Sequence, residues 1–265
     1  MHTHALTGGL TAIQDAMEIP GLGVLPVNAF LLRGTQPLLV DTGLPQSREE
    51  FLTTLGDLVE PADLRWIWLS HPDRDHTGSL YELLELAPQA RIITTFLGVG
   101  ICSIDRPLPM DRVFLLKPGQ QLDLDDRTLT CFRPPLYDSP ATTGFVDNLT
   151  GTVFSSDCFG SPLPNFELAG AGDVSAVPAQ DLEDGQRLWA TVDSPWISML
   201  DQAVFDSALA PELLLSTHLP PATGRAGEFL DRLATLPGSA PFTGPDQAAL
   251  AAMLAEFETV SAAHR

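Results

Sequence analysis

Cysteine, basic residues and long apolar runs are all scarce in this sequence. The 265 residues include only three cysteines, Cys102, Cys131 and Cys158, and no C-x-x-C pair. Neither a disulfide framework nor a cysteine-rich metal site is indicated, and a reducing, cytoplasmic location is expected. No apolar run approaches the roughly 20 residues that a membrane-spanning helix needs. The first residues also lack an export signal, so His2 and His4 are expected in a frayed terminus.

Basic residues are outnumbered by acidic ones, 14 against 34, which gives a formal charge of −20. Such a surface repels phosphate backbones and anionic lipid headgroups, so neither nucleic acid nor a membrane is expected as a partner. Solubility accounts for most of this acidity. The hydrophobic fraction of 44% supports a substantial core and excludes a mainly disordered chain.

Short apolar runs between glycine and proline turns predict a chain that is mostly sheet in its first half. We expect strands within residues 22–34, 36–43, 65–71, 90–96, 111–116, 129–135, 151–157 and 212–218. Helical spacing of apolar residues predicts helices over 47–59 and 78–87. It also predicts an amphipathic helix over 246–262, which would pack Leu250, Met253, Leu254, Phe257 and Val260 on the core. One domain over residues 1–265 is the simplest organisation.

The stretch LSHPDRDHTGS, residues 69–79, places His71, Asp73, Asp75 and His76 within six positions. It follows a predicted strand, and open α/β sheets place their sites at the carboxyl ends of strands. The adjacent Asp75 and His76 can reach two neighbouring ions. An acidic turn that caps the next helix would explain one aspartate but not four ligand-type side chains. The pattern therefore predicts a site for two metal ions.

This stretch resembles the HxHxDH signature of the metallo-β-lactamase superfamily, with Asp73 where the second histidine normally stands. Three further features resemble those of that superfamily. They are VDTG at residues 40–43, Asp157 in FSSDCFG and His218 in LLLSTHLPPATG. The resemblance spans roughly residues 28–218. It implies an α+β fold, the four-layer αβ/βα sandwich, in which two mixed β-sheets are flanked by helices. Asp41 in VDTG would then either support the loops beneath the metals or cap a turn.

Within the superfamily, the acid at position 73 and the later spacing resemble the flavodiiron proteins. Asp138 follows Asp75 by 63 residues, Asp157 follows 19 later and His218 follows 61 later, as in that family. Two residues depart from the family pattern: Asp73 is shorter than the usual glutamate, and Asp138 replaces a histidine.

The resemblance implies a division of the ligands between two ions. One ion would be held by His71, Asp73 and Asp138. The second would be held by Asp75 and His218, and Asp157 would bridge the two ions. His76 matches a position that is a ligand in only some members, so we include it among the candidate metal ligands.

Four aspartates in one site carry a charge that two divalent ions would neutralise. Oxygen-rich ligation favours iron, with manganese or zinc as alternatives. The resemblance implies a di-iron oxidoreductase that binds and reduces or activates O2 or NO, with no catalytic side chain beyond the metal ligands. Since no flavin site is visible, electrons would come from a separate donor protein. The resemblance is also compatible with a small-molecule substrate. It is compatible with a homodimer as well.

Two other functions stay open at this point. A di-metal hydrolase with zinc or manganese would use a bridging hydroxide as its nucleophile. A non-catalytic di-iron protein would instead sense oxygen.

Overall fold

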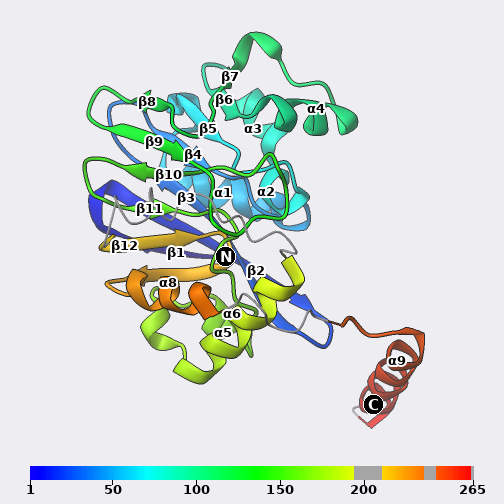
Figure 1. Ribbon diagram of the computed structural model, residues 1–265. Helices are drawn as coiled ribbons and strands as arrows, with labels where there is room; N and C mark the ends of the chain where they lie inside the picture. Colours follow the sequence, from blue (N-terminus) through cyan, green and yellow to red (C-terminus); the bar gives the residue numbers. More distant parts are fainter. Residues whose placement is uncertain (194–210, 236–242, 264–265) are drawn as a thin grey trace.

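Two β-sheets face each other, and helices cover their outer faces (Figure 1). The computed structural model describes residues 1–193, 211–235 and 243–263. The first sheet contains β1 (His2–Ala5), β2 (Leu10–Ile19), β3 (Gly23–Leu32), β4 (Leu38–Val40), β5 (Trp66–Trp68), β6 (Arg91–Thr94) and β7 (Val113–Leu115), in that order. Its strands pair antiparallel up to β4 and parallel from β4 to β7.

The second sheet has the strand order β13-β12-β11-β10-β9-β8. Its strands are β8 (Gln121–Asp123), β9 (Thr128–Phe132), β10 (Gly144–Asp147), β11 (Val153–Phe154), β12 (Leu213–Ser216) and β13 (Leu219–Thr223). Only the β11–β12 pair is parallel. Both sheets are therefore mixed, as the sequence predicts.

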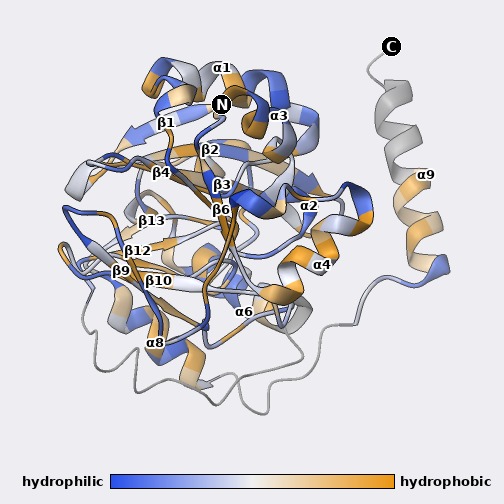
Figure 2. Cartoon of the chain, turned by 90° about the horizontal axis from the view of Figure 1, so that it is seen from above, coloured by the Kyte–Doolittle hydropathy of each residue, from blue (hydrophilic) through white to orange (hydrophobic). Residues whose placement is uncertain are grey.

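The helices form the two outer layers, which are seen edge-on in Figure 2. Beside the first sheet lie α1 (Arg48–Leu58), α2 (Arg74–Thr77), α3 (Leu80–Leu86) and α4 (Phe96–Asp105). Beside the second lie α6 (Ala179–Asp193) and α8 (Ala226–Thr235), while the short α5 (Phe166–Ala169) contacts β2 and β3. Large buried side chains fill the space between the sheets, among them Phe30, Trp68, Phe145 and Phe154. The four-layer αβ/βα sandwich is thus confirmed.

The amino terminus is ordered, contrary to the expected frayed end. Residues His2–Ala5 form the edge strand β1, and His2 pairs with Gln14 of β2. His4 Nε2 also lies 3.1 Å from the carbonyl oxygen of Gly170. The prediction was wrong because β1 is too short and polar to show a strand pattern, and its stability comes from pairing with β2.

The carboxy-terminal helix α9 (Gln247–Ala263) is confirmed, but its predicted packing stays a prediction. Figure 1 shows α9 apart from the sheets, and Leu250 and Leu254 are exposed. Met253 lies close to Gly21 in the β2–β3 turn. The side chains of Phe257 and Val260 lie outside the described residues.

Within the described ranges, every helix falls short of the length and apolar character that a membrane span requires.

The two sheets join at the edge where their parallel strands end. Asn28 of β3 donates its side-chain amide to the carbonyl oxygens of Ser216 (3.0 Å) and Leu219 (2.7 Å), on either side of the β12–β13 turn. The residues that follow β4, β5, β11 and β12 therefore meet at one edge of the sandwich. These four segments carry Asp41, the 71–76 loop, Asp157 and His218.

Candidate metal centre

The structure brings all seven predicted ligand side chains together at this edge. His71, His76, His218 and Asp157 are buried. Asp75 and Asp138 are partly exposed, and the Asp73 side chain is 52% exposed. The centre therefore has a buried, histidine-rich interior and an acidic outer side.

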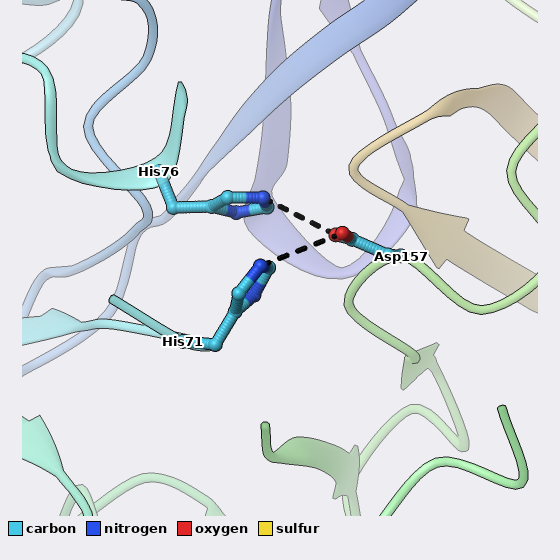
Figure 3. A group of neighbouring side chains, drawn as sticks. All are labelled: His71, His76 and Asp157. Atoms are coloured by element: carbon cyan, nitrogen blue, oxygen red, sulfur yellow. Dashed lines mark ion pairs between the residues drawn. The ribbon is translucent and has the colours of Figure 1, made fainter. Parts of the chain in front are cut away.

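Asp157 lies in the middle of the three histidines. Its Oδ1 is 3.2 Å from His76 Nε2, and its Oδ2 is 3.5 Å from His71 Nε2 and 3.4 Å from His218 Nε2. Figure 3 shows His71 and His76 pointing their imidazole rings toward this carboxylate. One carboxylate thus faces three imidazole nitrogens, the position that a bridging ligand requires.

The remaining carboxylates lie on the two sides of Asp157. His71 Nε2 is 3.8 Å from Asp73 Oδ2 and 3.9 Å from Asp138 Oδ1. On the other side, Asp75 Oδ2 is 3.5 Å from His76 Nε2 and 3.4 Å from His218 Nε2.

Three overlapping groups of potential ligand atoms result, each with its atoms within 4.8 Å of one another: His71 with Asp73 and Asp138, Asp75 with His76 and His218, and His71 with His76 and Asp157. The third group takes one histidine from each of the others and so lies between them. The arrangement offers two neighbouring ion positions.

Several of these atoms have no hydrogen-bond partner within the described part of the chain. His71 Nε2, His76 Nε2 and Asp138 Oδ1 are buried and form no hydrogen bond. Buried polar atoms in native proteins are nearly always satisfied, so such a cluster indicates a missing ligand. Imidazole nitrogens and carboxylate oxygens suit iron, manganese and zinc. The donor set therefore fits a pair of first-row metal ions.

Asp41 holds His76 from behind. Asp41 Oδ2 lies 2.8 Å from His76 Nδ1, and the same carboxylate accepts hydrogen bonds from Ser70 N and Ser70 Oγ, each at 2.8 Å. With Nδ1–H donating to Asp41, the lone pair of Nε2 faces the centre. His218 is fixed in the same way, since its Nδ1 lies 2.7 Å from the carbonyl oxygen of Pro26. Asp41 therefore supports the centre rather than capping a turn.

Asp41→Asn is expected to weaken metal binding by roughly 10–100-fold, the usual cost of losing such a partner. Asparagine tolerates the positive φ of 56° at this position, so the fold should persist. Its amide nitrogen would donate to His76 Nδ1 and move the imidazole proton to Nε2, where it blocks the metal. Titration with Mn²⁺ measures the affinity, and wild-type affinity in the variant would contradict this role for Asp41.

Trp189 of α6 is a neighbour of the centre that sequence reasoning did not single out. Its indole Nε1 donates to the carbonyl oxygen of Asp157 at 3.0 Å, and its ring lies edge-on to His218 with centroids 4.9 Å apart. Gly160 makes room for it, since a Cβ there would lie 2.4 Å from Trp189 Nε1. Tryptophan is not a ligand type, so only the folded structure reveals this contact.

The charges of the centre interact strongly. Burial opposes the charged form of Asp157, but His218, His71 and His76 outweigh it and hold the pKa of this carboxyl well below its usual range. Burial alone would lower the pKa of His218, but Asp157 and Asp75 raise it to about 9. The pKa of Asp138 is raised, first by burial and then by Asp157 and Asp73. The pKa of His76 is also raised, because the opposing effect of burial is outweighed by Asp75, Asp157 and Asp41.

Metal binding is therefore expected to release protons at pH 7, and the apparent affinity should rise with pH up to about 9, where His218 loses its proton. This pH dependence follows from the raised pKa of His218. Its pairing with Asp157 stabilises the metal-free protein fully below pH 6.5, the pKa of histidine in the unfolded chain. That stabilisation is lost as the pH rises through about 9, so metal then competes with fewer protons. Calorimetric titration with Mn²⁺ in two buffers of different ionisation enthalpy measures the protons released. Equal heats in both buffers would contradict the expectation.

Comparison with known proteins shows which families the chain is similar to. Residues 22–95 match the model of the metallo-beta-lactamase superfamily. The diflavin flavoprotein A 3 of Nostoc sp. is 30% identical over 134 residues, which is 50% of this chain and 23% of that protein. The coenzyme F420H(2) oxidase of Methanothermobacter thermautotrophicus is 34% identical over 143 residues, 51% of this chain and 35% of that protein.

Among solved structures, the rubredoxin oxygen:oxidoreductase of Desulfovibrio gigas superposes with a TM-score of 0.75 at 18% identity. The superposition covers 88% of this chain and 60% of that one. The matches to the two sequence relatives span only 23% and 35% of their lengths. Together these findings confirm that the chain resembles the metallo-β-lactamase superfamily and, within it, the flavodiiron proteins.

Proposed function

We propose that this chain is the metal domain of a di-iron oxidoreductase that binds O2 or NO and reduces or activates it. The supporting observation is the convergence of three imidazole nitrogens and three further carboxylates around Asp157 in overlapping groups. One ion would be held by His71, Asp73 and Asp138, and the other by Asp75, His76 and His218. Asp157 would lie between them.

When bound, two irons would supply the electron transfer that O2 or NO reduction requires. The residues of this chain hold the ions and set their surroundings. Asp41 and the Pro26 carbonyl orient His76 and His218, and the buried interior excludes water from the histidine side. The exposed Asp73 side leaves an approach for small molecules.

Electrons would come from a separate donor. Two of the similar proteins are named for a reduced coenzyme and for rubredoxin, which makes a reduced coenzyme or a small redox protein the first donors to test. The three cysteines are buried, and the location we propose for the protein is the cytoplasm.

A zinc or manganese hydrolase is the second candidate, and His76 favours it. The flavodiiron resemblance leaves the role of His76 open, but its Nε2 lies inside the centre, 3.2 Å from Asp157 Oδ1. A third imidazole makes the donor set richer in nitrogen and therefore more suitable for zinc. A bridging hydroxide between two such ions would then be the nucleophile.

Parallel loading with iron and with zinc distinguishes the two candidates. With iron and a chemical reductant, we expect consumption of O2 or NO that an Asp157→Ala variant lacks. If iron-loaded protein consumes neither gas while zinc-loaded protein hydrolyses a thioester or phosphoester, the oxidoreductase proposal is wrong and the hydrolase replaces it.

A further inference from the structure

A cleft of about 520 Å³ lies beside the candidate metal centre, between the loop that carries α2 and the helix α4. Three groups of residues line it. The α2 side contributes Pro72, Asp73, Arg74, Asp75 and Thr77, the α3 helix contributes Leu80 and Tyr81, and α4 contributes Ile101, Cys102, Ile104 and Asp105. The volume lies in the range of roughly 300–1,000 Å³ that is typical of small-molecule sites.

The cleft borders the side of the centre that solvent reaches. Two candidate ligands line it, Asp73 and Asp75, whose side chains are 52% and 23% exposed. The three histidine side chains, by contrast, are at most 1% exposed. A molecule in the cleft would therefore meet the carboxylate side of the centre.

The opposite wall is apolar, although it faces solvent. Ile101 and Ile104 lie one turn apart on α4 and are 36% and 80% exposed. Phe96 and Leu97 on the same helix are also exposed, and Figure 2 shows hydrophobic colour along α4. Exposed apolar side chains gathered on one helix are a feature of binding surfaces.

The polar groups of the cleft are mostly engaged. Arg74 Nη1 pairs with Asp105 Oδ2 at 3.1 Å, Thr77 Oγ1 donates to the Asp73 carbonyl at 2.9 Å, and the Tyr81 hydroxyl donates to the Cys102 carbonyl at 3.2 Å. A ligand would find few free donors here. Because the polar groups are engaged and the exposed wall of Ile101 and Ile104 is apolar, an uncharged, apolar ligand fits best.

We propose that this cleft binds an uncharged, predominantly apolar organic molecule and holds it against the Asp73–Asp75 side of the centre. Such molecules would be the class of small-molecule substrate presented to the metals. The link to the metals rests on the proposed function, whereas apolar binding in the cleft does not depend on it.

Fluorescence titration with the uncharged probe N-phenyl-1-naphthylamine tests the binding itself. We expect saturable binding of one probe per chain, weakened at least tenfold in the double variant Ile101→Gln and Ile104→Gln. Both side chains are partly or largely exposed, so the fold should tolerate the change. The matched control is Leu115→Gln, a 44% exposed leucine that does not line the cleft, and it should bind like wild type.

Equal binding by wild type and the double variant would overturn the proposal, as would no binding by wild type. If wild type instead self-associates in gel filtration and the double variant does not, α4 is a protein contact and the proposal is also wrong.

Fluorine relaxation of bound 4-fluorotoluene tests the position of the ligand. Mn²⁺-loaded protein should broaden the fluorine signal strongly, whereas Zn²⁺-loaded protein should not. Metal analysis of the same samples tests the proposed function separately from the proposed ligand cleft. If the protein binds no metal, the proposed function is wrong, and the probe titration still shows whether the cleft binds an apolar ligand. Bound Mn²⁺ with no broadening would place the ligand away from the centre and contradict the proposal.

Discussion

Asp157→Ala is expected to abolish binding of the metal pair while leaving the fold intact. Asp157 faces the Nε2 atoms of His71, His76 and His218 at 3.2–3.5 Å, so its removal would take one ligand from both proposed ion positions at once. The loss in affinity should exceed the roughly 10–100-fold that removal of an outer partner costs. The metal content measured after gel filtration should fall from two ions per chain in the wild type to less than one in the variant.

The matched control for this variant is Asp147→Asn. Asp147 is also a buried aspartate, but it pairs with Arg127 Nη1 at 3.0 Å and accepts from Thr150 Oγ1 at 2.8 Å in the turn between β10 and β11. Its change should cost about 1–3 kcal/mol of stability through lost hydrogen bonds and keep both ions. An Asp157→Ala protein that retains two ions would refute the bridging role.

Gly78→Ala is expected to produce the largest loss of stability near the centre. A Cβ at this position would lie 2.3 Å from the carbonyl oxygen of Gly43 and 2.5 Å from Leu44 C. These are backbone atoms, so no flexible side chain can move aside. The free energy of unfolding should fall by about 3 kcal/mol, the upper end of the usual overpacking penalty. Thermal unfolding should then occur roughly 6–12 °C lower.

The same change should disturb metal binding, because Gly78 lies where two loops of the centre cross. Thr42 N donates to the His76 carbonyl at 2.7 Å, and Gly78 N donates to the Gly43 carbonyl at 2.9 Å. The matched control is Gly56→Ala in the exposed face of α1, where nothing lies within 4 Å of the added Cβ. That change should stabilise the protein by roughly 0.5–1 kcal/mol. Similar stability of the two variants would contradict the crowding argument.

The sequence predicts the central strands and the 71–76 loop well because their signals are local. Trp66–Trp68 is an apolar run of strand-forming residues, and the histidines and aspartates follow it within a few positions. Asp138, Asp157 and His218 are different, because residues 60 or more positions apart carry no local sign of contact. Only the family resemblance placed them in the centre, and the structure brings them together.

Other features depend on tertiary contacts that no local pattern shows. The strand β1 is stabilised by its pairing with β2. The contact of Asp41 with His76 needs a backbone with positive φ at Asp41, and the contact of Trp189 with His218 needs α6 to pack beside β12. The ligand side chains were therefore predictable, and Asp41 was a candidate for supporting them, whereas its contact with His76 and the role of Trp189 were not.

Metal content of protein purified anaerobically from iron-supplemented cells tests the central claim most directly, together with the optical spectrum before and after exposure to air. We expect two irons per chain and a spectral change in air, with both absent in Asp157→Ala. One ion or none per chain would contradict a binuclear centre, and two zinc or manganese ions with no spectral change would contradict the di-iron proposal.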